Sequence, residues 1–165
     1  MTLVGDKLTY NAAFVYLTTN RTFYIVNEES GTVLELITGS NKVDHVAQQA
    51  ENKRQEWTAA LASNEGGTIA VTLTNAFSTN AVLSVGDPVL YTTALLPSTG
   101  VGADAQQWAF LPISGTWRST NVGQFMIASM SKFPQVLSTI ETSVILTTSA
   151  SAGGLKEQWS LILAS

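Results

Sequence analysis

Three tryptophans divide the chain into thirds, and their spacing limits the fold more than any other feature of the sequence. Trp57, Trp108 and Trp159 are 51 residues apart, and each follows a pair of Gln or Glu residues. A bulky aromatic residue at a fixed period indicates copies of one supersecondary unit that bury their large side chains together. We therefore expect the tryptophans to be structural and to occupy equivalent places in three repeats.

A second segment recurs upstream of the tryptophans and supports this period. The segment FYIVNEESGTVLEL at 23–36 has a counterpart 102 residues later, FMIASMSKFPQVLST, which is twice the tryptophan spacing. Between them, VTLTNAFSTNAVLSV at 71–85 fits the same pattern with slightly shifted spacing. A chain of 165 residues fits one domain, 1–165. Within it we expect three repeats, at about 20–62, 63–113 and 114–165.

Each repeat contains four short β-type runs bounded by turn residues. The twelve runs are TFYIV, SGTVLEL, KVDHVA and QEWTAAL; TIAVTL, AVLSV, PVLYTTA and QQWAFLPI; and QFMIAS, QVLSTI, SVILTTS and EQWSLIL. The segment 46–62 has a helix-forming composition, but its counterparts before Trp108 and Trp159 contain glycines that weaken a helix. Since one repeat is too small to bury its apolar face, the sequence predicts an all-β fold in which three repeats close around one core.

The residue composition argues against catalysis and against a metal site. The sequence contains no cysteine and one histidine, which excludes a thiolate site, a Cys-His nucleophile and a two-histidine zinc motif. The Gly-x-Ser-x-Gly elbow and the Gly-Lys-Ser/Thr phosphate loop are absent from the sequence. A carboxylate pair for glycoside hydrolysis stays open among Glu28, Glu29, Glu35 and Asp44. We expect a non-catalytic protein with neither cofactor nor metal.

Charged residues are few and are concentrated near the N-terminus. The formal net charge of −4, without a basic cluster, argues against nucleic-acid binding. The longest uncharged stretch is interrupted by Thr, Asn and Ser, which argues against membrane insertion. No secretory signal is visible in MTLVGDKLTY, so we expect a cytoplasmic protein. Beyond Glu65 the surface is largely Thr, Ser and Ala, which suits either a neutral solvated surface or a contact with another protein.

The residues around the tryptophans resemble a known family. Gln55-Glu56-Trp57 and Gln106-Gln107-Trp108 match the Gln-x-Trp signature of ricin B-like β-trefoil lectins, and Glu157-Gln158-Trp159 is a degenerate third copy. The segment TFYIVNEESGTVLEL is similar to the start of a repeat in cysteine-free fungal members. The resemblance covers about residues 20–163. It implies a β-trefoil of twelve strands with pseudo-threefold symmetry.

The resemblance also implies shallow carbohydrate sites, one available to each repeat. Family members place an acidic residue after the aliphatic pair of the second strand, an aromatic residue or His on the third strand, and polar residues at or just before Gln-x-Trp. A carboxylate and amides hydrogen-bond to sugar hydroxyls, and a ring packs on the apolar face of the sugar. In the first repeat the corresponding residues are Glu35, His45, Asn52, Gln55, Asp44 and Gln48.

Carried over by position, Glu35 takes the acidic place, where the family usually has Asp. His45 is near the stacking position, and Asn52 and Gln55 are the amide partners. A one-residue change of strand register would exchange which of the nearby residues, such as Asp44, face the site. Arg54 stands where the family often has Asn.

The other two repeats have serine at the acidic position, namely Ser84 and Ser138. Because a hydroxyl does not replace a carboxylate, we expect one competent site, in the first repeat. Tyr91, Asp104 and Gln106 are weaker candidates in the second repeat.

The function implied by the resemblance is that of a lectin for glycans of glycoproteins or glycolipids that end in galactose or N-acetylgalactosamine, of the fungal, defence-related kind. The alternative is a β-trefoil with decayed sugar sites that binds protein, as a protease inhibitor or as an accessory subunit of a larger enzyme. A lectin with one site needs more than one subunit to agglutinate cells, so we expect a homodimer. Residues 1–20 are interpreted as an added strand or a lead into the first repeat.

Overall fold

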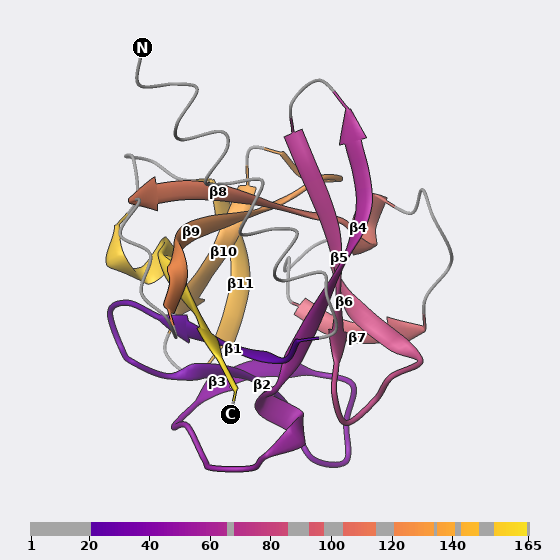
Figure 1. The fold of residues 1–165 in the computed structure, drawn as a ribbon, viewed down its shortest axis with the longest axis vertical. Coiled ribbons are helices and arrows are strands. Elements are labelled where there is room, and N and C mark those ends of the chain that lie inside the picture. Colours follow the sequence, from indigo (N-terminus) through magenta and orange to yellow (C-terminus); the bar gives the residue numbers. More distant parts are fainter. Residues whose placement is uncertain are drawn as a thin grey trace.

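The computed structural model describes residues 21–65, 68–85, 93–97, 104–114, 121–133, 135–140, 143–148 and 154–164, and these residues are almost entirely β-structure (Figure 1). The strands are β1 (Phe23–Asn27), β2 (Val33–Leu36), β3 (Val43–Val46), β4 (Trp57–Glu65), β5 (Thr68–Asn75), β6 (Ala81–Val85), β7 (Thr93–Pro97), β8 (Trp108–Ser114), β9 (Asn121–Ser129), β10 (Gln135–Ile140), β11 (Ser143–Thr148) and β12 (Trp159–Leu163). The all-β prediction is confirmed. None of the described helices is long and apolar enough to cross a membrane.

Six strands close into a barrel. Antiparallel pairing runs from β1 to β12, β9, β8, β5 and β4, and β4 returns to β1 through the pair Phe23 and Trp57. The first of the described strands, β1, therefore lies beside the last, β12, as Figure 1 shows for indigo β1 and the yellow strand near the C-terminus. Closure leaves the barrel without a free edge.

Three hairpins, β2–β3, β6–β7 and β10–β11, extend this barrel. Each hairpin is hydrogen-bonded to the barrel strand that precedes it, and β11 also pairs with β3 between Ser143 and Asp44. The three groups β1–β4, β5–β8 and β9–β12 thus have the same connectivity.

The three tryptophans occupy equivalent places inside this frame. Each indole is fully buried in one continuous core. The indole N–H groups of Trp57, Trp108 and Trp159 donate to the carbonyl oxygens of Leu34, Leu83 and Leu137, at 3.1, 2.9 and 3.1 Å. Since each acceptor lies in the second strand of its group, the tryptophan joins the hairpin to the barrel.

A second set of bonds joins one group to the next. The backbone N–H groups of Glu28, Ala76 and Met130 each donate to a backbone carbonyl oxygen of another group. The acceptors are the residues directly before Trp159, Trp57 and Trp108, respectively, and the N···O distances are 2.9 to 3.0 Å. Asn27 and Asn75 reinforce two of these joints, since each side-chain amide donates to two carbonyls of the turn before the tryptophan. Ser129 takes the same place at the third joint.

Several strand bounds differ from the sequence prediction, since β4 continues past the predicted end at Leu61 and β9 begins at Asn121, before the predicted start at Gln124. A single 3₁₀ turn precedes each tryptophan, at Lys53–Gln55, Asp104–Gln106 and Leu155–Glu157, and the predicted strands included part of these turns. Strand β7 continues to Pro97, past the predicted end at Ala94, and the earlier part of that predicted strand lies outside the described residues. Residues 1–20 also lie outside them.

Replacing Trp108 by Phe is expected to destabilise the fold by about 2–4 kcal/mol, because the smaller ring leaves a cavity and the Leu83 carbonyl loses its buried donor. The measurement is chemical denaturation followed by circular dichroism. Leu61→Ala is the control, since Leu61 is 58% exposed and its loss should change the free energy of unfolding by less than about 0.5 kcal/mol. Equal stability of the two variants would contradict the structural role of Trp108.

Candidate functional site

The candidate site lies where the hairpin β2–β3 meets the 3₁₀ turn before Trp57. In this hairpin Glu35 is directly opposite Asp44, so the two carboxylates share one face. Leu34 is opposite His45 on the other face, and Leu34 belongs to the buried core. The register therefore separates Glu35 and Asp44 from His45.

The carboxylate of Glu35 is held on one side by two amides. Its Oε2 atom accepts from Nε2 of Gln55 at 2.6 Å and from Nδ2 of Asn52 at 3.2 Å. No described residue donates to Oε1, and the side chain is partly exposed. One oxygen of the carboxylate is thus fixed by the protein, and the other is left for an external donor.

Gln55 is the buried centre of this network. Its side chain is fully buried, and its Nε2 donates to Ala47 O at 2.9 Å as well as to Glu35. Its Oε1 accepts from the backbone N–H of Gln49 at 2.7 Å. Because every polar atom of the amide has a partner, Gln55 fixes both the carboxylate and the chain that follows β3.

Asn52 caps the 3₁₀ turn and completes the network. Its Oδ1 accepts from the backbone N–H of Arg54, while its Nδ2 donates to Oε1 of Gln49 at 3.1 Å in addition to Glu35. The next residue, Lys53, pairs with the buried Glu56 at 2.8 Å. The hydrogen bond to Glu56 and the charge of Glu56 raise the pKa of Lys53.

Asp44 and His45 have partners of their own. Asp44 forms an ion pair with Lys42 at 2.9 Å and is largely buried. His45 is half-buried, and its Nδ1 is 2.7 Å from Oγ1 of Thr32. The structure thus brings Glu35, Asn52 and Gln55 together and places Asp44 across from Glu35, but it does not bring His45 into the network.

Gln48 and Gln49 are neighbours in the chain after β3, but only Gln49 takes part in the Glu35 network. Gln48, a predicted candidate, is exposed and takes no part in the network among the described residues. Gln49, which the sequence did not single out, contributes its backbone N–H and its side-chain oxygen. Its only sequence signal was its place in the uncharged run between the third strand and the turn.

The positions equivalent to Glu35 in the second and third repeats are occupied by serine and carry no carboxylate. Gln106 donates to Oγ of Ser84 at 3.2 Å, and Ser84 in turn donates to Val82 O. In the third repeat Glu157 accepts from Thr147, and Ser138 is buried. The side chain of Asp104 and the whole of Tyr91 lie outside the described residues.

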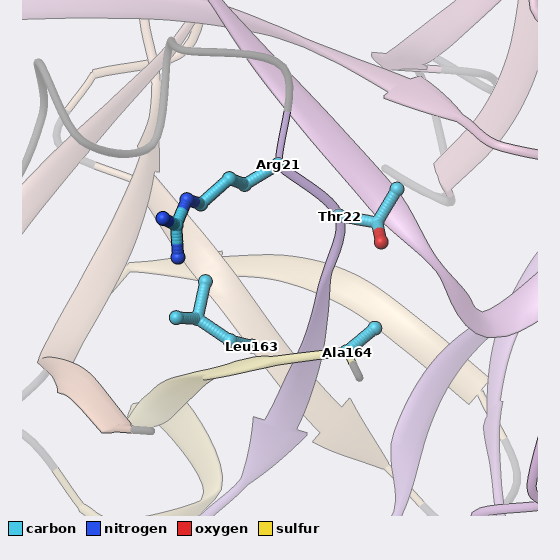
Figure 2. Close-up of a pocket in the computed structure, with 4 residues that line it drawn as sticks. All are labelled: Arg21, Thr22, Leu163 and Ala164. Carbon is cyan, nitrogen blue, oxygen red and sulfur yellow. The ribbon is translucent and has the colours of Figure 1, made fainter. Parts of the chain in front are cut away.

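Figure 2 shows a separate hollow beside the pairing of β1 and β12, with a volume of about 240 Å³. It is lined by Arg21, Thr22, Leu163 and Ala164, none of which belongs to the Glu35 network. Among the described ranges, no group of three or more His, Asp or Glu residues is placed to hold a metal ion.

Comparison with known proteins identifies the fold. No protein-family model matches the sequence, and no curated protein matches it either. Among solved structures, the BEL β-trefoil is similar with a TM-score of 0.66 and 16% identity, over 87% of this chain and 93% of that chain. The C-half of an earthworm R-type lectin in complex with GalNAc is similar with a TM-score of 0.56 and 16% identity, over 87% and 98%.

A third similar structure is a GlcNAcα1-4Gal-releasing endo-β-galactosidase from Clostridium perfringens, with a TM-score of 0.67 and 18% identity over 88% of this chain. The present chain spans about a third, 33%, of that protein. The likenesses, together with the barrel and its three hairpins, show that this chain has a β-trefoil fold.

Replacing Gln55 by Leu is expected to destabilise the protein by about 2–3 kcal/mol, because the backbone N–H of Gln49, the Ala47 carbonyl and Glu35 all lose a buried partner. Gln48→Leu is the matched control, since Gln48 is exposed and its change should stay within about 0.5 kcal/mol. Urea denaturation gives both free energies of unfolding. If Gln55→Leu were as stable as its control, the network would not hold the site together.

Proposed function

We propose that this protein is a non-catalytic, carbohydrate-binding lectin of the ricin B-like β-trefoil kind, with its sugar site in the first repeat. The observation that supports it most is the Glu35 carboxylate, with one oxygen fixed by Asn52 and Gln55 and the other without a described donor. A sugar binder needs this arrangement, since a preoriented carboxylate accepts hydrogen bonds from sugar hydroxyls without first having to be ordered.

The proposal includes three repeats, at about 20–62, 63–113 and 114–165, of which only the first has a carboxylate at the position of Glu35. Ser84 and Ser138 stand at its place in the others. The Ser84 hydroxyl oxygen already accepts a hydrogen bond from Gln106, and Ser138 is buried. A buried or already hydrogen-bonded hydroxyl is poorly placed to bond to a sugar hydroxyl. We therefore expect the sugar to bind at the first repeat.

For the ligand class we propose glycans that end in galactose or N-acetylgalactosamine, in a protein of the cysteine-free fungal kind with a role in defence. Two neighbours support a sugar of this type by their own descriptions: an R-type lectin half in complex with GalNAc, and an endo-β-galactosidase that releases GlcNAcα1-4Gal. His45 and Asp44 are second to Glu35 in this proposal, because each already has a protein partner.

Replacing Glu35 by Gln is expected to weaken binding to galactose- or N-acetylgalactosamine-terminated glycans by roughly tenfold or more, since the charged acceptor is lost while the side-chain size is kept. A glycan array, followed by titration calorimetry on the best ligand, gives the comparison. Ser138→Ala is the matched control, because it changes the equivalent position of the third repeat. Undiminished binding by the Glu35 variant would remove Glu35 from the site.

A second candidate function is binding to another protein, as an inhibitor or as an accessory subunit of an enzyme. It is favoured by Ser84 and Ser138, which stand at the acidic position in two repeats, and by exposed apolar side chains such as Phe133, which is 65% exposed. This candidate would be supported if the wild-type protein bound no glycan but formed a stoichiometric complex with a protease or glycosidase.

We further expect the protein to be a homodimer if it agglutinates cells, because a chain with one sugar site cannot link two cells. Size-exclusion chromatography with light scattering should then give twice the 17.6 kDa mass of one chain. Glu35→Gln should keep this mass and lose agglutination. Agglutination by a protein of single-chain mass would instead require a second sugar site on the chain.

A further inference from the structure

An arginine stacked on an exposed phenylalanine lies next to the Glu35 network. The guanidinium carbon of Arg54 is 3.7 Å from the centre of the Phe77 ring, which corresponds to a cation–π contact. Phe77 is 55% exposed, and Arg54 is partly exposed. Arg54 belongs to the 3₁₀ turn that also contains Gln55, whereas Phe77 follows β5 in the next repeat.

The side chain of Asn75 fixes the two residues relative to each other. Its Nδ2 donates to Arg54 O at 2.8 Å, and its Oδ1 accepts from the backbone N–H of Phe77 at 3.1 Å. The backbone N–H of Arg54 donates to Asn52, the same side chain whose amide holds Glu35. The guanidinium therefore extends from a backbone that is tied directly to the sugar site.

The guanidinium itself has unused hydrogen-bonding capacity. Arginine carries five N–H donors in one plane, and a ring stacked on one face leaves the edges of that plane open. Among the described residues, neither an ion pair nor a side-chain hydrogen bond occupies these donors. Among the described residues Arg54 is thus an oriented cation without an anionic partner, and the edge of its guanidinium can donate to an external anion.

The stacked pair is not required by the fold. The position of Arg54 is occupied by Ala105 and Lys156 before the other two tryptophans. The position of Phe77, two residues after Asn75, corresponds to Glu29 after Asn27 and to Ser131 after Ser129. All three joints form with their backbone hydrogen bonds in place. The contact of Arg54 with Phe77 is therefore made only at the turn of the repeat that has a carboxylate at the acidic position.

We propose that Arg54, held by Phe77, makes the first-repeat site specific for acidic glycans, in which a sulfate or carboxylate group lies beside the sugar bound at Glu35. This inference rests on the proposed sugar-binding function. Glu35 accepts from the hydroxyls of the neutral sugar, and the guanidinium edge donates two parallel hydrogen bonds to the anionic group. Since the guanidinium is already stacked and oriented, little of its freedom is lost on binding.

The test compares one galactoside in four forms: unmodified, sulfated on O3, sulfated on O6, and extended with sialic acid. At least one acidic form should bind the wild-type protein about three- to tenfold more tightly than the unmodified form in titration calorimetry. Arg54→Gln should abolish this preference while changing the affinity for the unmodified galactoside by less than about twofold. Arg54→Lys should restore only part of it, because an ammonium lacks the planar fork.

Lys156→Gln is the matched control, since it removes one positive charge at the equivalent position of the third repeat. It should leave the preference unchanged, which separates a local contact from a general effect of net charge. Phe77→Leu should reduce the preference, because the guanidinium loses its ring. Thermal melts of all variants check that the fold is intact.

The outcomes separate this inference from the function on which it rests. Equal binding of neutral and acidic galactosides by wild-type protein, or a preference that survives Arg54→Gln, would overturn the role of Arg54 while leaving the sugar site in place. A loss of binding to all four forms in Arg54→Gln would make it a general binding residue and would also overturn the specificity. Absence of binding by wild-type protein to every form would overturn both.

Discussion

The bond from each buried indole to a carbonyl of the second strand sets the geometry on which the rest of the molecule depends. Trp57 donates to Leu34, and this bond holds the residue after Leu34 near the residue two before Trp57. These residues are Glu35 and Gln55, and they form the centre of the candidate site. The same bond brings Ser84 to Gln106 in the second repeat. A site at this place is therefore a direct consequence of how the core is packed.

The groups β1–β4, β5–β8 and β9–β12 share their core contacts more closely than the residues of the candidate site. The indole bonds and the joints between repeats recur with nearly the same distances, because a lost buried partner costs free energy at each of them. Positions at the rim carry Glu35 in one repeat and serine in the others, and Arg54 has alanine and lysine counterparts. The fold constrains these side chains weakly, so they are free to carry a function in one repeat only.

The features that depend on the core were predictable from the sequence, whereas contacts that depend on strand register or join two repeats have no local signal in it. Equal tryptophan spacing and alternating apolar runs were enough for the all-β fold and for strands such as β1, β6 and β10, which coincide closely with their segments. The pairing of Glu35 with Asn52 and Gln55 followed from the family resemblance. The face of His45 depends on a register of one residue between β2 and β3, and the contact of Arg54 with Phe77 joins two repeats, so neither has a local signal.

The pairing of β1 with β12 has a consequence for how the chain is made. Five residue pairs join the two strands, from Phe23 with Leu163 to Asn27 with Trp159. During synthesis on the ribosome β1 is made before its partner β12, so the barrel cannot close until β12 has also been made. Until then β1, which contains the apolar residues Phe23 and Ile25, has unpaired backbone groups along one edge. Such an edge can pair with other chains. Vectorial synthesis thus leaves the unpaired edge of β1 open to misassociation until β12 has been made.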